Sequence, residues 1–213
     1  MERKDRLFKI YHKLYRALGP QYWWPGETPF EVAVGAILTQ NTNWGNVEKA
    51  IENLKREKAL SARAIHKMPL DRLALLIKPA GYFNIKAKRL KAFINFLVNE
   101  YDGSMKNMKD EDLKTLRTKL LSVSGIGPET ADSILLYALH KPVFVIDAYT
   151  KRVLSRHSIM GHKEPYNKFQ ALFHISLKRN VQLFNEYHAL FVRLGKTYCR
   201  TKPICGGCPL EGI

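Results

Sequence analysis

The stretch SGIGPETAD, residues 124–132, decides the fold of this chain. Gly125 and Gly127 flank a single aliphatic residue, and glycine reaches backbone angles that other residues adopt only at a cost. Pro128 suits the first turn of a helix, because the N–H group that proline lacks has no intrahelical partner there. The stretch therefore predicts two helices joined by a tight turn, whose backbone N–H groups face outward in a site suited to phosphate. An ordinary helical connection is the alternative.

A single acidic residue follows the turn at a short distance. Asp147 comes fifteen positions after Asp132, within VFVIDAYTKRV at residues 143–153. It can be the N-cap of a helix that begins at Ala148, because a carboxylate in that position accepts a hydrogen bond from a backbone N–H group. It can also be a carboxylate that the intervening helix holds near the phosphate-binding turn. Asp147 thus shifts the interpretation of the turn towards a functional site.

Helical periodicity dominates the rest of the chain. Apolar residues recur at three- and four-residue steps, as in Phe8, Tyr11, Leu14, Tyr15 and Leu18, and again in Leu90, Phe93, Ile94 and Leu97. Glycine and proline mark the connections between these runs. The apolar run at residues 143–146 has the length of a short strand, but no second run pairs with it. The sequence therefore predicts an all-α fold.

The charge of the chain indicates its partner. Lysine and arginine number 35 against 19 acidic residues, which gives a net charge of +16 over 213 residues. Such an excess favours a polyanion, usually nucleic acid, although an inert basic surface is the alternative. Hydrophobic residues make up 46%, enough to bury a core, and no apolar run is long enough for a membrane span. The charged N-terminus is not a secretory signal, so we expect a cytoplasmic protein, associated with the prokaryotic nucleoid. We also expect a monomer.

The segments LLSVSGIGPETADSILLYAL, residues 120–139, and VFVIDAYTKRV together resemble the helix-hairpin-helix superfamily (HhH-GPD) of DNA glycosylases. Within it the chain is most similar to the endonuclease III and 3-methyladenine glycosylase III groups. The resemblance implies two helical subdomains, 27–133 and 1–26 plus 134–213, with the active-site cleft between them. It implies that damaged double-stranded DNA is the partner. Asp147 matches the catalytic aspartate of the family.

The same resemblance assigns DNA contacts outside the catalytic acid. AILTQNTNW, residues 36–44, resembles a helix whose polar residue fills the gap left by a flipped base, and AGYFNIKAKRLKAF, residues 80–93, resembles a loop that inserts a wedge. An aromatic wedge can replace lost base stacking. Taken singly, the plug can be a turn cap and the wedge a packing residue. The positions expected to contact DNA are Gln40 (plug), Tyr82 (wedge), Gly125, Ile126, Gly127, Thr130 and Lys196.

A pocket for the flipped base is expected near YWWPGETPF, residues 22–30. The element Trp23-Trp24-Pro25 resembles one that the 3-methyladenine glycosylase III group carries at this place. An alkylated purine carries positive charge on its ring, so an aromatic slot attracts it by cation–π and stacking forces. The alternative is that both tryptophans belong to the core.

The family position of a lyase lysine is occupied by Glu129. In bifunctional members that lysine attacks the sugar and forms a Schiff base, after which the strand is cut. A carboxylate cannot form an imine, and Glu129 in the first helical turn complements the helix dipole instead. Lys151, four residues after Asp147, is a conceivable substitute amine. We therefore expect no AP-lyase activity.

All three cysteines, Cys199, Cys205 and Cys208, lie in the last fifteen residues. Such a clustered, odd set in an intracellular chain favours metal ligation over disulfides. The family pattern for a 4Fe-4S cluster is Cys-x6-Cys-x2-Cys-x5-Cys, whereas this chain has five residues in the first gap and then two. The fourth cysteine of the pattern falls at position 214, outside the sequence given. A 4Fe-4S cluster held by these thiolates is the expected cofactor, with a degenerate cluster or zinc as alternatives.

These features predict a monofunctional base-excision-repair DNA N-glycosylase. We expect it to remove alkylated purines such as 3-methyladenine by base flipping and hydrolysis assisted by Asp147. One alternative is an endonuclease III-like enzyme for oxidised pyrimidines or mismatched thymine or uracil. Another is a non-catalytic DNA-binding module that uses the hairpin alone.

Overall fold

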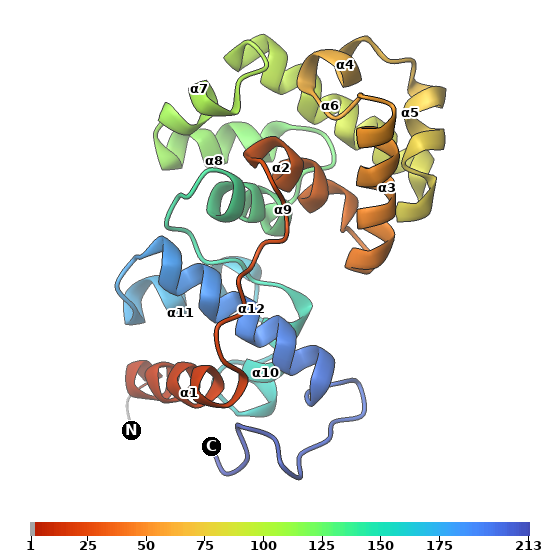
Figure 1. The fold of residues 1–213 in the computed structure, drawn as a ribbon. Coiled ribbons are helices and arrows are strands. Elements are labelled where there is room, and N and C mark those ends of the chain that lie inside the picture. The colour runs from red at the N-terminus through yellow and green to blue at the C-terminus, as the bar shows by residue number, and fades with distance from the viewer. Residues whose placement is uncertain (1–2) are drawn as a thin grey trace. The chain divides into compact units, whose positions relative to one another are not determined.

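The computed structural model describes residues 3–213, and every regular element in that range is a helix (Figure 1). The predicted all-α fold is confirmed. No helix among these residues combines the length and the apolar character needed to cross a membrane.

The chain forms two compact units. The first, which we call the hairpin unit, is Trp24–Lys141; the second, the Asp147 unit, is the chain up to Trp23 together with Pro142–Ile213. The sequence placed these boundaries at 27 and 133. The later boundary moves because a π-helical segment, η2 (Ile134–Ala138), packs against α2 (Pro29–Leu38) and so stays in the hairpin unit.

The hairpin unit is built around its longest helix, α6 (Phe83–Tyr101), which packs against α2 and its other neighbours through a buried apolar stripe. The predicted tight turn joins α8 to α9, so the helix-turn-helix prediction is confirmed. The remaining elements of this unit are α3 (Trp44–Arg56), α4 (Ala62–Lys67), α5 (Leu70–Leu76), η1 (Lys78–Ala80), α7 (Met105–Asp110), α8 (Leu113–Ser122) and α9 (Pro128–Ser133).

The Asp147 unit contains α1 (Arg3–Leu18), α10 (Ala148–Arg156), α11 (Tyr166–Ser176) and α12 (Val181–Thr197). α12 packs against both α1 and α10. Gly195 permits the close approach to α10, because a Cβ atom at this position would lie 2.3 Å from the Tyr149 ring. The Tyr187 hydroxyl of α12 donates to the Leu7 carbonyl of α1 at 2.8 Å, which ties the first helix to the last.

The apolar run at residues 143–146 is extended and buried, but it pairs with no strand within residues 3–213. Side chains on one face of α11 take the place of a neighbouring strand. Phe144 N–H donates to His174 Nε2 at 3.0 Å, and the Phe144 carbonyl accepts from Gln170 at 2.8 Å. Ile146 N–H donates to the Tyr166 hydroxyl at 3.2 Å. These bonds satisfy backbone groups that burial would otherwise leave unpaired, and they fix the segment that leads into Asp147.

Candidate active site

The turn between α8 and α9 needs its first glycine for two reasons. Gly125 has a φ of +84°, in the region that favours glycine. A Cβ atom there would also lie 2.2 Å from Cγ of Arg89, whose side-chain stem runs from α6 along the turn. Gly127 has an ordinary φ of −88° and nothing within 4 Å of its added Cβ. The two glycines therefore have different roles: Gly125 makes the turn possible, and Gly127 keeps its outer surface open.

Two other hairpin residues face inward. The Ile126 side chain is buried, and its N–H donates to the Val123 carbonyl at 3.0 Å. The Thr130 side chain is also buried, whereas Glu129 is exposed in the first turn of α9. A phosphate on this surface would meet the backbone around Gly125 and Gly127, which are both exposed.

Gln40 lies against the hairpin. Its Nε2 donates to the Gly125 carbonyl at 3.1 Å and to Thr130 Oγ1 at 2.9 Å, while Arg89 Nη1 donates to its Oε1. Gln40, the residue predicted to be the plug, is therefore bonded to the turn that is predicted to bind phosphate, across 85 positions of the chain. Arg89 is a residue of this site that the sequence did not reveal, because its role depends on long-range contacts.

Tyr82 is the exposed N-cap residue of α6. Its φ is +46°, in the left-handed region where a tyrosine is uncommon, and the residue is 70% exposed. Gly81 before it also has a positive φ, +71°. This backbone presents an aromatic side chain to solvent, as a wedge requires.

Asp147 is the N-cap of α10, and it is buried. Its Oδ1 accepts from Thr150 N–H at 2.7 Å, and its Oδ2 lies 3.5 Å from Nε2 of His188 on α12. Burial by itself raises the pKa of the Asp147 carboxyl, but His188 and the Thr150 hydrogen bonds outweigh it, so that the pKa lies below its usual range. The site therefore holds an ionised carboxylate at neutral pH. The N-cap interpretation is thus correct, and it is compatible with a catalytic one.

A cavity of about 370 Å³ in the hairpin unit lies beside Trp24 and Trp44. The two rings meet edge to face with centroids 5.4 Å apart, and Trp24 also packs on Tyr137 at 5.1 Å. Gly35 lets both indoles approach α2, because an added Cβ would lie 3.2 Å from Trp44 and 3.4 Å from Trp24. Trp44 was missed from the sequence, although it closes the quoted stretch AILTQNTNW.

The rim of this cavity is acidic in a strongly basic protein. Lys55 bonds to Glu27 and Glu31, each at 3.0 Å, and these hydrogen bonds raise the pKa of Lys55. Four glutamates and one lysine line the cavity. We call it the Trp24 cavity from here on. Its lining is Trp24, Pro25, Gly26, Glu27, Glu31, Trp44, Glu48, Ile51, Glu52 and Lys55.

Trp23 does not line the Trp24 cavity. It belongs to the Asp147 unit, where Lys196 Nζ lies 5.8 Å from the centroid of its ring. Lys196 is exposed near the end of α12. The adjacent tryptophans thus belong to different structural units. Of the three residues predicted to form the pocket, Trp24 and Pro25 line the Trp24 cavity and Trp23 does not.

Arginines of α10 hold the cysteine tail. Arg152 donates to the Cys199 carbonyl at 2.7 Å, and Arg156 donates to Cys199 Sγ at 3.3 Å. Burial, followed by the neighbouring Cys199 and Cys205, raises the pKa of Cys208. Within residues 3–213, however, no group of three or more His, Cys, Asp or Glu side chains is placed to hold a metal ion. The family pattern needs four cysteines, whereas this sequence has three and is one residue short in the first gap. The positions of the three cysteines do not form a ligand cage.

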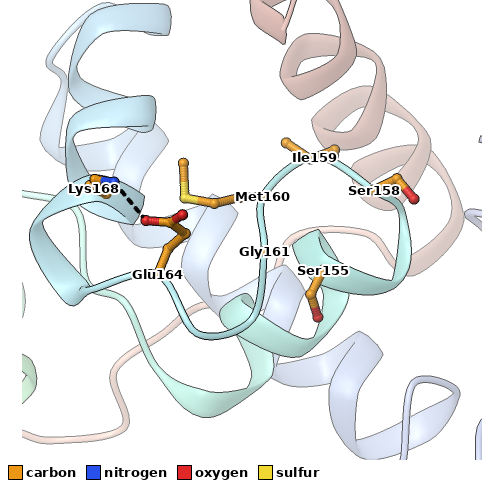
Figure 2. A pocket seen from close by; sticks show the side chains of 7 residues that line it. All are labelled: Ser155, Ser158, Ile159, Met160, Gly161, Glu164 and Lys168. Atoms are coloured by element: carbon orange, nitrogen blue, oxygen red, sulfur yellow. Dashed lines mark ion pairs between the residues drawn. The ribbon is translucent and has the colours of Figure 1, made fainter.

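Lys151 is engaged within its own unit. Its Nζ donates to the Glu164 carbonyl at 3.3 Å and lies 5.2 Å from the centre of the Phe169 ring. Nearby, a second cavity of about 520 Å³ is lined by the 155–168 region, with an ion pair between Glu164 and Lys168 (Figure 2). None of the residues predicted from the sequence lines this cavity.

Comparison with known proteins identifies the family. Residues 34–178 match the sequence model of the HhH-GPD superfamily of base excision DNA repair proteins. A Methanocaldococcus jannaschii protein named as a DNA repair glycosylase is 47% identical over 98% of this chain and 97% of its own length. Endonuclease III of Thermotoga maritima is 27% identical over 86% of this chain and 81% of its own.

The fold is shared with a solved structure. The crystal structure of the H. pylori 3-methyladenine DNA glycosylase MagIII bound to 1,N6-ethenoadenine superposes with a TM-score of 0.76. The two chains are 30% identical, and the match covers 92% of this chain and 98% of that one.

Proposed function

Because the chain belongs to the HhH-GPD superfamily of base excision DNA repair proteins, we propose that it is a monofunctional DNA glycosylase for alkylated purines. The observation that carries this proposal is the ionised, buried carboxylate of Asp147 at the start of α10. A glycosylase of this kind binds damaged duplex DNA, extrudes the altered base and hydrolyses its N-glycosidic bond.

Asp147 is proposed to act on the sugar of the extruded nucleotide. Departure of the base leaves an oxocarbenium-like sugar, and a fixed negative charge stabilises it as it develops. The same carboxylate orients the water that adds to the sugar carbon and accepts its proton. A cationic alkylated base is already a good leaving group, so a single carboxylate suffices.

The hairpin is proposed to bind a DNA phosphate through its backbone. Gly125 and Gly127 are exposed, and the net charge of +16 favours the approach of a polyanion. Gln40 and Tyr82 are proposed to occupy the space left by the extruded base and to wedge the duplex apart. This mode of binding depends on phosphate contacts and on the ease of base extrusion, so we expect it to be weakened by salt and insensitive to sequence.

The Trp24 cavity supports the choice of an alkylated purine. Aromatic walls attract a cationic ring by cation–π and stacking forces, and the surrounding glutamates favour positive over neutral ligands. The similarity to MagIII, whose crystal structure contains 1,N6-ethenoadenine, supports the same choice.

The cysteine tail favours a second candidate function, an endonuclease III-like enzyme for oxidised pyrimidines or mismatched thymine or uracil. The similarity to T. maritima endonuclease III over most of both chains supports it. We also propose a 4Fe-4S cluster on Cys199, Cys205 and Cys208 with one further ligand. This cofactor proposal rests on the cysteine pattern and not on the thiol positions. Iron content and visible absorbance of protein purified without oxygen test it, and iron-free, colourless protein contradicts it.

One assay separates the candidates. A panel of duplexes, each with a single lesion, is incubated with the full-length chain, and the released bases are identified. We expect release of 3-methyladenine and related alkylated purines. Release of oxidised pyrimidines alone selects the endonuclease III-like function, and specific binding without release of any base selects the non-catalytic module.

A further inference from the structure

Lys86 is a buried lysine in the first turns of α6, and its ammonium group contacts two turns at once. Nζ donates to the Leu38 carbonyl at 2.8 Å and to the Ala80 carbonyl at 2.7 Å, and the residue is 1% exposed. Burying an ammonium group is unfavourable unless hydrogen bonds compensate for the loss of water. A buried lysine at this position therefore indicates a specific role.

The two carbonyl groups occupy equivalent places in the site. Leu38 is the last residue of α2, and Gln40 follows it by two positions. Ala80 is the last residue of η1, and Tyr82 follows it by two positions. Each carbonyl therefore ends a helical segment just before a residue that is proposed to enter the DNA duplex. A cation at the end of a helix also complements its dipole.

We propose that Lys86 is a positioning residue for base flipping, which fixes the spacing between the turn that carries Gln40 and the turn that carries Tyr82. The inference rests on the proposed function, because it assumes that these two side chains contact DNA. Plug and wedge must reach the duplex together, and one ammonium group that bonds both turns sets the distance between them.

Other contacts of α6 also hold the residues proposed to be the plug and the wedge. Lys86 N–H donates to the Tyr82 carbonyl at 3.0 Å, so the backbone of the same residue also holds the wedge. Arg89, one turn later, donates to Gln40 and lies against Gly125.

Burial, and then the charge of Arg89, lowers the pKa of Lys86 to about 8. Near neutral pH the group thus remains largely protonated and keeps all its N–H donors.

The bland alternative is that Lys86 only stabilises the fold, and the chain contains a matched control for it. Lys91 lies on the same helix, and its Nζ donates to the carbonyls of Ile65 at 3.0 Å and His66 at 2.7 Å, near the end of α4. That turn carries no proposed DNA contact. Loss of either lysine leaves two carbonyl groups without their donor. Only Lys86, however, bonds to the turns that carry the proposed plug and wedge.

The experiment compares Lys86→Met with Lys91→Met under single-turnover conditions. The substrate is the lesion that the wild-type protein excises best, either paired in a duplex or placed opposite an abasic site. An unpaired lesion leaves the stack more easily, so it depends less on plug and wedge. We expect Lys86→Met to slow excision of the paired lesion by about ten-fold or more and to affect the unpaired lesion much less, whereas Lys91→Met changes both rates by the same factor.

Equal loss on both substrates, or no loss on the paired one, would overturn the positioning role of Lys86. If Lys86→Met does not fold, Lys86→Gln keeps one amide donor, and the ratio of its two rates decides in the same way. Failure of the wild-type protein to excise any base would instead contradict the proposed function, so the two failures are distinguishable.

Discussion

The carboxylate of Asp147 has a different protein partner for each oxygen: Oδ1 accepts from Thr150 N–H at 2.7 Å, and Oδ2 faces Nε2 of His188 at 3.5 Å. The first contact starts α10, and the second joins α10 to α12. His188 therefore contributes to the charge state of the proposed catalytic group as well as to the packing of the unit.

Replacing His188 should shift the pH dependence of excision. Burial raises the pKa of Asp147, and His188 lowers it. His188→Leu removes the larger lowering influence, so the pKa of Asp147 should rise. We expect the acid limb of the rate profile to move to higher pH, while DNA binding near neutral pH is retained. His188→Gln keeps a hydrogen-bond donor without charge and should shift the limb less. Single-turnover rates from about pH 4 to about pH 9 measure this; superimposable acid limbs for the three proteins would contradict it.

The lowered pKa of Asp147 also makes the stability of the protein depend on pH. The pKa of Asp147 is lowered on folding, so its stabilising contribution is present above the ordinary carboxyl pKa and is lost as the pH falls through the lowered value.

The two hairpin glycines should respond differently to substitution. Gly125→Ala places a methyl group against Arg89 at a positive φ, so we expect a loss of stability of about 1–3 kcal/mol. Gly127→Val adds atoms where there is open space and should leave the melting temperature near that of the wild type. It should nevertheless weaken binding to damaged and undamaged duplexes alike. Fluorescence anisotropy at low salt measures the affinities. Unchanged affinity for both duplexes would show that the hairpin does not bind a DNA phosphate.

Local signals explain why part of the site could be predicted from the sequence. The turn at Gly125 to Pro128 and the N-cap at Asp147 depend on a few neighbouring residues, and both helix boundaries lie where these residues predict them. The hairpin unit ends at Lys141, later than the predicted 133, because η2 packs against α2, a contact between segments about a hundred residues apart.

Residues with long-range roles could not be predicted in this way. Lys86, Arg89 and His188 read as helix positions in the sequence, and only the folded chain brings them to Leu38, Gln40 and Asp147. The converse holds for Trp23 and Trp24, which are adjacent in one sequence motif but belong to different units.

Trp44 should contribute to substrate choice. Trp44→Ala removes one wall of the Trp24 cavity, and base stacking on an aromatic ring is worth about 1–3 kcal/mol in nucleic-acid sites, so excision of cationic bases should fall about ten-fold or more. Binding to a duplex with an abasic-site analogue, which has no base to stack, should change little. Equal losses on both ligands would indicate that Trp44 only supports the fold.

Glu48→Gln and Glu52→Gln test the charge of the same cavity. Both residues are exposed at its rim, so the fold should tolerate the changes. We expect excision of cationic 3-methyladenine to fall relative to that of neutral 1,N6-ethenoadenine. An unchanged ratio would show that the glutamates do not act on the base.

Borohydride should not trap the protein on DNA during turnover. Glu129 cannot form an imine, and the Lys151 ammonium is bonded to the Glu164 carbonyl. We therefore expect an abasic product with an intact strand and no covalent adduct. A strong adduct that disappears in Lys151→Ala would identify that lysine as the nucleophile.

Asp147→Asn tests the central claim most directly. The substitution keeps an oxygen for Thr150 N–H but removes the negative charge that is proposed to stabilise the reacting sugar. The measurement is release of free base from a duplex with one alkylated purine, together with the affinity for the same duplex. We predict that the wild-type protein releases the base, and that the variant binds with similar affinity but releases it at least about a hundred-fold more slowly. Near-normal release by Asp147→Asn would contradict the account.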